Sequence, residues 1–416
     1  MKRFTMQIGA VADDFTGATD LATTLRRRGM SAAVVIENQE IAADRLAGLD
    51  AVVVALKSRT APVGVAVADS LAALERVIGW GAERVYLKYC STFDSTDEGN
   101  IGPVLDAFVD RLAVDRTVVV PAFPANGRTV ENGTLYVNGD LLENSSMRHH
   151  PLTPMTKSRL SEILAPQTHA AISEIPLDVV REGVDALRAA VDAAAPGYLV
   201  VDATDDADLR TIALATAHLR LLSGGAGLAT GLDATGTASP DDFPRFGARR
   251  LVVCGSASAT TRAQIADAAS KHPTRKVDVS AAVADPAAEV DAIAQWVRSL
   301  DASAVPVVYS VGELADVLPG EAGAAAASVV ESVLSAVVAR LVDDGTVDQV
   351  IVAGGETSGA VVKALGISLL TIGPQLAPGV CWSAADTAGG HEVALVLKSG
   401  NFGAVDLFTS AWEVLV

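Results

Sequence analysis

The sequence predicts two α/β domains with mostly parallel sheets and an active-site cleft between the domains. Short apolar runs alternate with helical patterns along nearly the whole chain, which is typical of βαβ units. The 416 residues are too many for one ordinary core, and half of them are hydrophobic. A segment rich in small residues, Pro and Asp separates two such series. We therefore expect a first domain at 1–233, a linker at 234–247 and a second domain at 248–416.

The first domain opens on an apolar run and then alternates between strand and helix patterns. We expect strands near 6–12, 32–37, 50–56, 84–89, 116–120, 170–175 and 197–202. Helices are expected near 17–28, 63–79, 101–113, 180–194 and 206–220. Between 121 and 157 the periodicity fails and Pro, Gly, Asn and His accumulate. This predicts a long irregular segment, and loops of that length usually have a function or are disordered.

The second domain shows the same alternation. We expect strands near 250–254, 276–279, 305–310, 349–353 and 393–397, with helices near 259–271, 286–299, 322–343 and 358–365. Ala and Val dominate, and only 4% of the residues are aromatic. This composition suits buried parallel strands covered by Ala-rich helices.

Charge and cysteine content exclude several classes of protein. Fifty acidic and 32 basic residues give a net charge of −18, which argues against a nucleic-acid partner. The three cysteines are odd in number and far apart, so we expect reduced core residues and no disulfide. We see no signal-peptide pattern and no 18-residue apolar segment, and therefore expect a cytoplasmic protein without a membrane partner.

Paired carboxylates follow the first strand directly. Asp13 and Asp14 end the apolar run, and Thr16 and Gly17 begin the next helix. The carboxyl end of a parallel strand opens into the crevice where ligands bind, and a helix start offers free N–H groups to an anion. One carboxylate is then placed to accept a proton or a hydroxyl hydrogen bond. The alternative is that Thr16 only caps the helix while one Asp faces solvent.

A second polar segment leaves the strand near 84–89. Lys88 is placed to neutralise a carboxylate, and Asp94 to accept hydrogen bonds from sugar hydroxyls. The segment offers three further polar side chains to orient a polyhydroxy acid, those of Ser91, Ser95 and Asn100. The alternative is a cap for the helix that begins near Ile101, but a cap needs only one or two such residues.

Three more candidate binding residues lie in the irregular segment 121–157. Arg128 follows two prolines and is suited to bidentate binding of a carboxylate or phosphate, although a surface arginine is the simpler alternative. Arg148 and His149 lie in a proline-braced loop and are candidate substrate contacts. The other histidines are scattered, so a zinc site is not expected, and metal ligands cannot be assigned.

The second domain has three turns of small residues, each at the end of a predicted strand. Glycine permits close backbone approach, and free amides at such turns bind anions. Three of them in one domain favour a nucleotide, although any one alone is simply a tight turn. The candidate residues are Ser256 and Ser258, then Gly354, Gly355, Glu356, Thr357, Ser358 and Gly359, and finally Lys398, Gly400 and Asn401.

Two other nucleotide-binding motifs fail specific checks. The chain contains no G-x-x-x-x-G-K-[ST] sequence, which excludes a P-loop enzyme. The run from Gly225 to Thr230 begins like a dinucleotide-binding turn, but it has Thr at the third glycine position and follows a helix-like stretch. A sugar-acid dehydrogenase is therefore a weak alternative.

Taken together, these motifs resemble the four-carbon acid sugar kinase family over essentially the full length. The resemblance rests on Ala12–Ala18, on Pro121–Pro124 with Gly127–Thr129, and on the three turns of the second domain. It implies that the first domain binds a sugar acid and the second binds ATP. The Lys88–Thr96 and Met147–Thr156 segments look like the branch that acts on 3-oxo-tetronates. D-threonate and D-erythronate kinases tend to read Lys-x-x-Asp-Ser-Thr-Leu-Arg-Gly-Asn, whereas here extra residues intervene between Lys88 and Asp94, and Asp97-Glu98 replaces Leu-Arg.

The resemblance implies transfer of phosphate from ATP, with Mg²⁺, to the C4 hydroxyl of a four-carbon acid sugar. Asp14 is the first candidate for the base, and Asp13 or Asp94 are substitutes, while Lys88 and Arg128 bind the substrate carboxylate or steady the transferred oxygens. A D-threonate or D-erythronate 4-kinase is the nearest alternative, and a non-catalytic sugar-acid-binding protein is a more distant one. We further expect the chain to be a homodimer.

Overall fold

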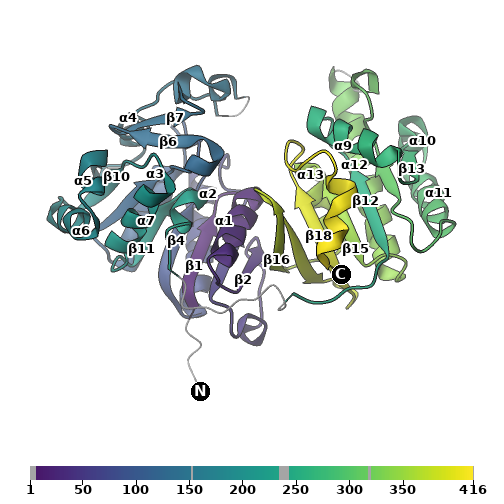
Figure 1. Cartoon of the computed structure of the whole chain (residues 1–416), viewed down its shortest axis with the longest axis horizontal. Coiled ribbons are helices and arrows are strands. Elements are labelled where there is room, and N and C mark those ends of the chain that lie inside the picture. The colour runs from purple at the N-terminus through teal and green to yellow at the C-terminus, as the bar shows by residue number, and fades with distance from the viewer. Residues whose placement is uncertain (1–5, 151–152, 234–242, 317–319, 416) are drawn as a thin grey trace. The chain divides into compact units, whose positions relative to one another are not determined.

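The computed structural model describes residues 6–150, 153–233, 243–316 and 320–415, which form two compact units divided between 238 and 239 (Figure 1). The first unit runs from purple to teal in Figure 1, and the second from green to yellow. Each unit has helices packed on a sheet, so the α/β class is confirmed. Most of the expected linker, 234–242, lies outside the described residues.

The first unit contains a fully parallel sheet in the order β2-β3-β1-β4-β11-β5-β10-β9. Its inner strands read as continuous apolar runs because both of their faces are covered. The strands are β1 (Met6–Ala12), β2 (Ala32–Ile36), β3 (Ala51–Ala55), β4 (Ala82–Lys88), β5 (Arg116–Val120), β9 (Ala171–Ile175), β10 (Gly197–Val201) and β11 (Leu221–Gly224). The helices are α1 (Phe15–Arg27), α2 (Val63–Gly79), α3 (Ile101–Leu112), α4 (Leu160–Leu164), α5 (Leu177–Arg181), α6 (Val184–Ala193), α7 (Asp206–Ala215) and α8 (Ala226–Ala229).

The segment expected to be irregular contains a small antiparallel sheet. Its strands are β6 (Arg128–Glu131), β7 (Thr134–Val137) and β8 (Asp140–Leu141). Each is too short to show a clear alternation. The two turns nevertheless had a sequence signal, because Asn132-Gly133 and Asn138-Gly139 are Asn-Gly pairs, the strongest short hairpin signal. In the structure both residues of each pair have positive φ.

The glycine run after residue 224 differs from the expectation in its context. It follows strand β11, not a helix, and β11 was missed because it is only four residues long. Its glycines serve packing: a Cβ on Gly227 would lie 2.1 Å from the carbonyl oxygen of Ala122. The Tyr86 hydroxyl also donates a hydrogen bond of 2.5 Å to the Gly225 carbonyl. The helix that follows, α8, has only four residues.

The second unit has a mixed sheet in the order β13-β14-β12-β15-β18-β17-β16. The strands from β13 to β18 in this order are parallel, and β17 and β16 add an antiparallel edge. The strands are β12 (Arg250–Cys254), β13 (Thr274–Lys276), β14 (Val307–Tyr309), β15 (Gln349–Ala353), β16 (Leu369–Ala377), β17 (Val380–Asp386) and β18 (Glu392–Lys398). The helices are α9 (Ala259–Ala269), α10 (Val279–Ala284), α11 (Pro286–Arg298), α12 (Gly320–Asp343), α13 (Gly355–Ala364) and α14 (Leu407–Ser410).

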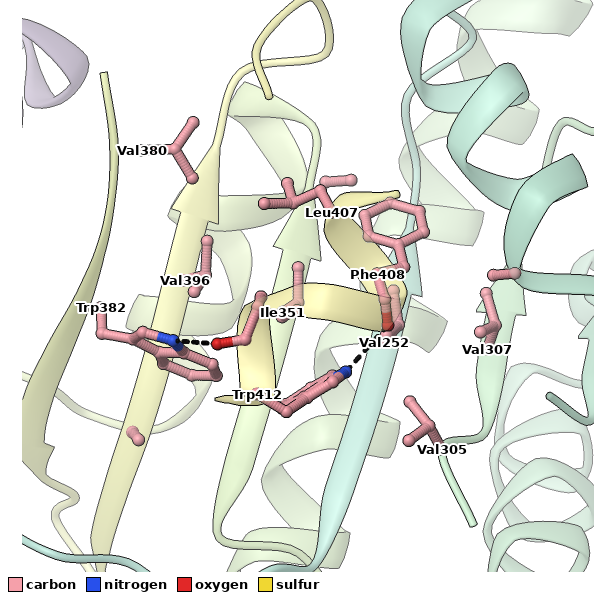
Figure 2. Close-up of a cluster of buried hydrophobic side chains, with 14 of the residues drawn as sticks. Val252, Val305, Val307, Ile351, Val380, Trp382, Val396, Leu407, Phe408 and Trp412 are labelled. Carbon is pink, nitrogen blue, oxygen red and sulfur yellow. Dashed lines mark hydrogen bonds between the residues drawn. The ribbon is translucent and has the colours of Figure 1, made fainter. Parts of the chain in front are cut away.

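A cluster of buried aromatic side chains fixes the C-terminal segment to this sheet (Figure 2). The rings of Trp382 on β17 and Trp412 lie 5.5 Å apart. Each indole N–H is satisfied by a main-chain carbonyl, that of Ala411 for Trp382 at 3.0 Å and that of Phe408 for Trp412 at 2.8 Å. Buried tryptophans combine large apolar contact with a satisfied donor in this way. The cluster therefore holds α14 beside the end of β18.

Helix α12 corrects one expectation. Its stretch Ala325–Asp343 has a mean hydropathy of 1.7 and is long and apolar enough to cross a membrane by those criteria alone. In the fold it packs against α11 and α13. Val333, Leu334 and Val337 are buried, and Arg340 pairs with Asp291 of α11. It has the features of a core helix of an α/β unit.

Candidate functional site

In the first unit the chain changes direction across the sheet at β1. From β1 the chain builds β2 and β3 on one side and then crosses to β4 on the other. In open α/β sheets, ligands bind outside the carboxyl ends of the strands at such a switch point. The last residue of β1, Ala12, pairs with Ala55 of β3 and with Lys88 of β4. The segments that follow these three strands therefore meet at one edge.

Arg59, in the segment after β3, joins the carboxylates at this edge. Its Nε and Nη2 atoms each lie 2.9 Å from an oxygen of Asp13, which gives a bidentate pair. Nη2 also lies 3.0 Å from Asp14 Oδ1, and Nη1 lies 3.8 Å from Asp94 Oδ2. The two predicted acidic motifs are thus brought together by an arginine that the sequence analysis did not select.

Asp14 is the N-cap of α1, because its Oδ1 accepts a 2.7 Å hydrogen bond from the Gly17 amide. The alternative in which Thr16 caps the helix is therefore wrong, and Thr16 itself lies half-buried in the first turn. Burial and the neighbouring Asp13 raise the pKa of Asp14, whereas Arg59 and Lys88 act in the opposite direction. This carboxylate is consequently a better proton acceptor than an ordinary exposed one.

Two further cations, Lys88 and Arg128, act on carboxylates of helix α1. Lys88 is buried at the end of β4, and its Nζ donates to the Tyr89 carbonyl at 2.8 Å. A Cβ on Gly17 would lie 3.1 Å from that Nζ, so the ammonium is next to the first turn of α1. Burial raises the pKa of Asp20 on the same helix, while Lys88 and Arg128 favour its charged form. Among the described atoms, Nε of Arg128 is buried without a hydrogen-bond partner.

The polar side chains of the 91–100 segment have different roles. Thr92 donates to Asp94 Oδ1 at 2.6 Å, and Ser95 donates to Gln167 at 3.0 Å, so Ser95 orders its loop. Asn100 precedes α3 but makes no side-chain cap, which removes the capping alternative. Ser91 lies beside Gly225. An opening of about 370 Å³ adjoins this segment, lined among others by Asp13, Arg59, Lys88, Asp94, Ser95 and Asn100.

The two remaining candidates of the first unit lie on a surface loop. Arg148 and His149 are exposed, and Arg148 donates to the carbonyl of Glu143 on the same loop. The structure does not bring them to Arg59 through any contact between described residues. Their role in substrate binding stays a prediction.

The second unit has its own switch point, at β12. The chain goes from β12 to β13 and β14 on one side and then to β15 on the other. Cys254 and Ala353 pair at the ends of β12 and β15, and Ala353 also pairs with Lys398 at the end of β18. All three predicted turns therefore lie at the carboxyl edge of this sheet.

Two of these turns contact each other through Lys398 and Gly400. Ser258 caps α9 and donates to the Gly400 carbonyl at 2.7 Å, and Thr261 donates to the same oxygen at 2.9 Å. Lys398 is 1% exposed, and its Nζ lies 3.2 Å from both Thr261 Oγ1 and that carbonyl. Burial lowers the pKa of Lys398 to about 8. A Cβ on Gly400 would lie 2.2 Å from Ser256 Oγ, so Ser256 belongs to this cluster, whereas Asn401 is exposed.

The third turn begins α13. Gly354 has φ +135°, which only glycine adopts without strain, and Thr357 lies directly beneath it. Gly355 and Gly359 face open space, since a Cβ at either position meets no atom within 4 Å. Glu356 is exposed in the first turn, and Ser358 Oγ is buried without a partner among the described atoms. An opening of about 700 Å³ adjoins the turn, lined among others by Gly255, Ala257, Ser310, Ala326, Val330, Glu356 and Thr357.

Sequence reasoning missed Arg59 and Thr261. Arg59 lies in the segment that leaves β3, as Asp13 and Asp14 lie in the segment that leaves β1, so the position after a strand was an available signal for Arg59. Thr261 lies one turn into α9 and had no such signal. Within the described ranges, no three His, Cys, Asp or Glu side chains are grouped to hold a metal ion.

Comparison with known proteins places these two sites in a family. Residues 8–232 match the model of a sugar-binding N-terminal domain, and residues 251–408 match that of a nucleotide-binding C-terminal domain. Curated 3-oxo-tetronate kinases are similar to this chain over nearly its full length and theirs. The kinase of Pseudomonas fluorescens is 43% identical, over 97% of this chain and 96% of its own. The chain belongs to the four-carbon acid sugar kinase family. The kinase of Brucella melitensis is 40% identical over 98% and 96% of the two chains, and that of Salmonella typhimurium 41% over 98% of each.

Solved structures of similar chains carry the same fold as this kinase-family chain. A crystal structure from Salmonella typhimurium LT2, provisionally called a tRNA synthase, has a TM-score of 0.89 at 39% identity and covers 98% of both chains. A Haemophilus influenzae protein has a TM-score of 0.86 at 36% identity, over 98% of this chain and all of its own. The acidic cluster around Arg59 lies within the sugar-binding match, and the three turns lie within the nucleotide-binding match.

Proposed function

We propose that this chain is a kinase that transfers the γ-phosphoryl group of ATP to the C4 hydroxyl of a 3-oxo-tetronate, giving the 4-phosphate and ADP. The observation that carries the proposal is the identity of about 40%, over nearly the whole of both chains, to several curated 3-oxo-tetronate kinases. The two switch-point sites supply the chemistry that such a reaction needs. The first unit offers cations and carboxylates for a sugar acid, and the second offers glycine turns for a nucleotide.

In the first unit we assign the substrate carboxylate to Lys88 and Arg128. Both are cations beside the first turns of α1, and the unpartnered Nε of Arg128 is free to donate. Asp14 accepts the hydrogen bond of the C4 hydroxyl and then its proton. Its burial favours this role, and Asp13 is less suited to it because Arg59 occupies both of its oxygens.

In the second unit we assign the phosphates of ATP to the cluster of Ser256, Ser258 and Lys398 and to the start of α13. Backbone N–H groups at a helix start and a buried ammonium both stabilise phosphate charge. Mg²⁺ bound to the nucleotide would supply further charge neutralisation. Magnesium sites of this kind retain several waters and few protein ligands, and Glu356 is the carboxylate available at the start of α13.

A substrate panel tests the reaction and its specificity. Purified protein with Mg·ATP is expected to release ADP with a 3-oxo-tetronate. With D-threonate, D-erythronate or L-threonate, ADP release should be at least about 10-fold slower, which corresponds to a difference of roughly 1.4 kcal/mol in activation free energy. Preference for threonate or erythronate would keep the kinase and replace the substrate. Binding of the sugar acid without any ADP release would instead favour a non-catalytic sensor. Reduction of a nicotinamide would favour a dehydrogenase.

Replacing Gly355 with Val tests the nucleotide site. The protein itself has room for the new side chain, because a Cβ at this position meets no atom within 4 Å. Stability should therefore change little, while the side chain crowds the phosphates, and we expect the Kd for ATP to rise at least 10-fold, or about 1.4 kcal/mol. Calorimetric titration with ATP checks this result. Gly64→Val, at an equally open glycine near the start of α2, is the control. An unchanged Kd for Gly355→Val would contradict the assignment.

A further inference from the structure

Arg59 is the common partner of three carboxylates that come from two different segments. Asp13 and Asp14 follow β1, Asp94 follows β4, and Arg59 itself follows β3. Its three nitrogens are all directed at these oxygens: Nε and Nη2 at Asp13, Nη2 also at Asp14, and Nη1 at Asp94. Nε and Nη2 are occupied by Asp13, whereas the 3.8 Å contact of Nη1 with Asp94 is an ion pair without a hydrogen bond. The main partners of Arg59 are therefore carboxylates, which points to a role in positioning them and balancing their charge.

The segment that carries Arg59 is itself held in place. Asn100 Nδ2 donates to the carbonyls of Ser58 at 2.7 Å, Ala61 at 2.9 Å and Arg59 at 3.2 Å. The amides of Ser58 and Arg59 in turn donate to the Asp13 carbonyl at 3.0 and 3.2 Å. Main-chain bonds therefore fasten the loop after β3 to the loop after β1, and the Asn100 side chain fastens it to the start of α3. This explains Asn100 as an anchor of the Arg59 loop.

We propose that Arg59 is a positioning residue that fixes the orientation of the Asp14 carboxylate and keeps it ionised. This inference rests on the proposed function, in which Asp14 accepts the proton of the substrate hydroxyl. The bidentate bond to Asp13 sets the plane of the guanidinium, and Nη2 then lies 3.0 Å from Asp14 Oδ1 as an ion pair. Asp14 Oδ1 also accepts a hydrogen bond from the Gly17 amide. These two contacts of Oδ1 fix the plane of the carboxylate and therefore the direction in which Oδ2 points.

The charges around Asp14 show why a cation is needed there. Asp13 and Asp20 repel its charge, Asp94 and Cys90 lie at the same guanidinium, and Lys88 and Arg59 oppose them. Burial raises the pKa of the Cys90 thiol to about 11, so Cys90 adds no charge at neutral pH. Without Arg59, Lys88 would be the main cation left to oppose the charges of Asp13, Asp14, Asp20 and Asp94, and it acts directly on Asp14 and Asp20. Like charges at short distance cannot all stay ionised, and Asp14 would take up a proton at higher pH.

Two variants separate charge from orientation. Arg59→Gln removes the cation, and we expect kcat/KM for the sugar acid to fall about 100-fold at pH 7. The acidic limb of the plot of kcat/KM against pH should move to higher pH by about one unit or more. Arg59→Lys keeps the charge but cannot form the bidentate pair with Asp13, and we expect kcat to fall about 10-fold with the acidic limb of the pH profile nearly unchanged. The Kd for ATP should be unchanged in both. Arg181→Gln breaks a comparable pair with the buried Asp208 elsewhere in this unit, and is expected to change stability but not the pH profile.

A measurement without turnover keeps this test separate from the proposed function. With ¹³C-labelled aspartate, the Asp14 resonance, assigned by its absence in Asp14→Asn, should titrate at higher pH in Arg59→Gln than in the natural protein. If the natural protein phosphorylates none of the sugar acids, the proposed function fails while this titration still reports on Arg59. Unchanged titration and an unmoved acidic limb in Arg59→Gln would overturn the charge role. A kcat in Arg59→Lys equal to that of the natural protein would overturn the positioning role. If Arg59→Gln does not fold, the Arg59→Lys result alone tests the proposal.

Discussion

Asp14→Asn is expected to lower kcat with the sugar acid by about 10²- to 10⁴-fold, the usual contribution of a positioned base. The Kd for ATP should stay within about twofold of its value in the natural protein, because the free energy of ATP binding to the second unit does not depend on a carboxylate in the first. The substitution is unusually clean because asparagine is as good an N-cap as aspartate, so the hydrogen bond to the Gly17 amide is retained. Rates of ADP release and calorimetric ATP titration measure the two quantities.

The pH profile and stability of this variant give a second check. Because burial raises the pKa of Asp14 above its unfolded value, the ionised group lowers stability at neutral pH, and this cost declines as pH falls below the folded pKa and is gone below the unfolded pKa. Asp14→Asn should therefore have a Tm at or above that of the natural protein at pH 7. In the natural protein kcat/KM should fall as pH drops through the raised pKa of Asp14, and the residual rate of the variant should lack that limb.

Asp205→Asn is the matched control, since Asp205 caps α7 in the same way and lies outside the proposed site. Its activity is expected to equal that of the natural protein. An unaltered kcat in Asp14→Asn would remove Asp14 from the mechanism and leave Asp94 as the next candidate, because one of its oxygens is more weakly held than those of Asp13.

Strand-end residues were the most predictable part of both sites. The apolar runs at 6–12 and 349–353 were readable because inner parallel strands are apolar on both faces. The residues directly after such a strand lie at the carboxyl edge of the sheet, which is why Asp13, Lys88 and the 354–359 turn could be predicted. The sequence does not show which strands are neighbours, and so it could not show that β1 lies between β3 and β4 and that the loops after these three strands meet at one edge.

The missed elements have other causes. Strands β7, β8 and β11 have four, two and four residues, too few for a hydrophobic period to be recognised. Strand β17 was missed although Pro378-Gly379 precedes it and Gly379 has φ +71°, a turn signal that a search for helices and parallel strands overlooks. Thr261 illustrates a further limit, since its contact with Gly400 joins residues 139 positions apart.

Lys88→Met and Lys398→Met are expected to have opposite effects on the two substrates. Methionine has nearly the same length and fits an apolar pocket, so each change mainly removes the ammonium. In Lys88→Met the substrate carboxylate loses a charge-assisted hydrogen bond worth about 1.5–3 kcal/mol, and the buried carboxylates lose a counter-charge. We therefore expect kcat/KM for the sugar acid to fall about 100-fold or more, with KM for ATP unchanged.

Lys398→Met should raise KM for ATP about 10-fold and leave KM for the sugar acid unchanged, because its ammonium faces the Thr261–Gly400 cluster. In the natural protein ATP affinity should also weaken as pH rises above about 8, where Lys398 loses its proton, and the variant should show no such dependence. Initial rates with each substrate varied in turn measure all four constants. If Lys88→Met raised KM for ATP as much as it impaired sugar-acid use, the ammonium would be serving the transferred phosphate, and the division of binding between the two units would have to be redrawn.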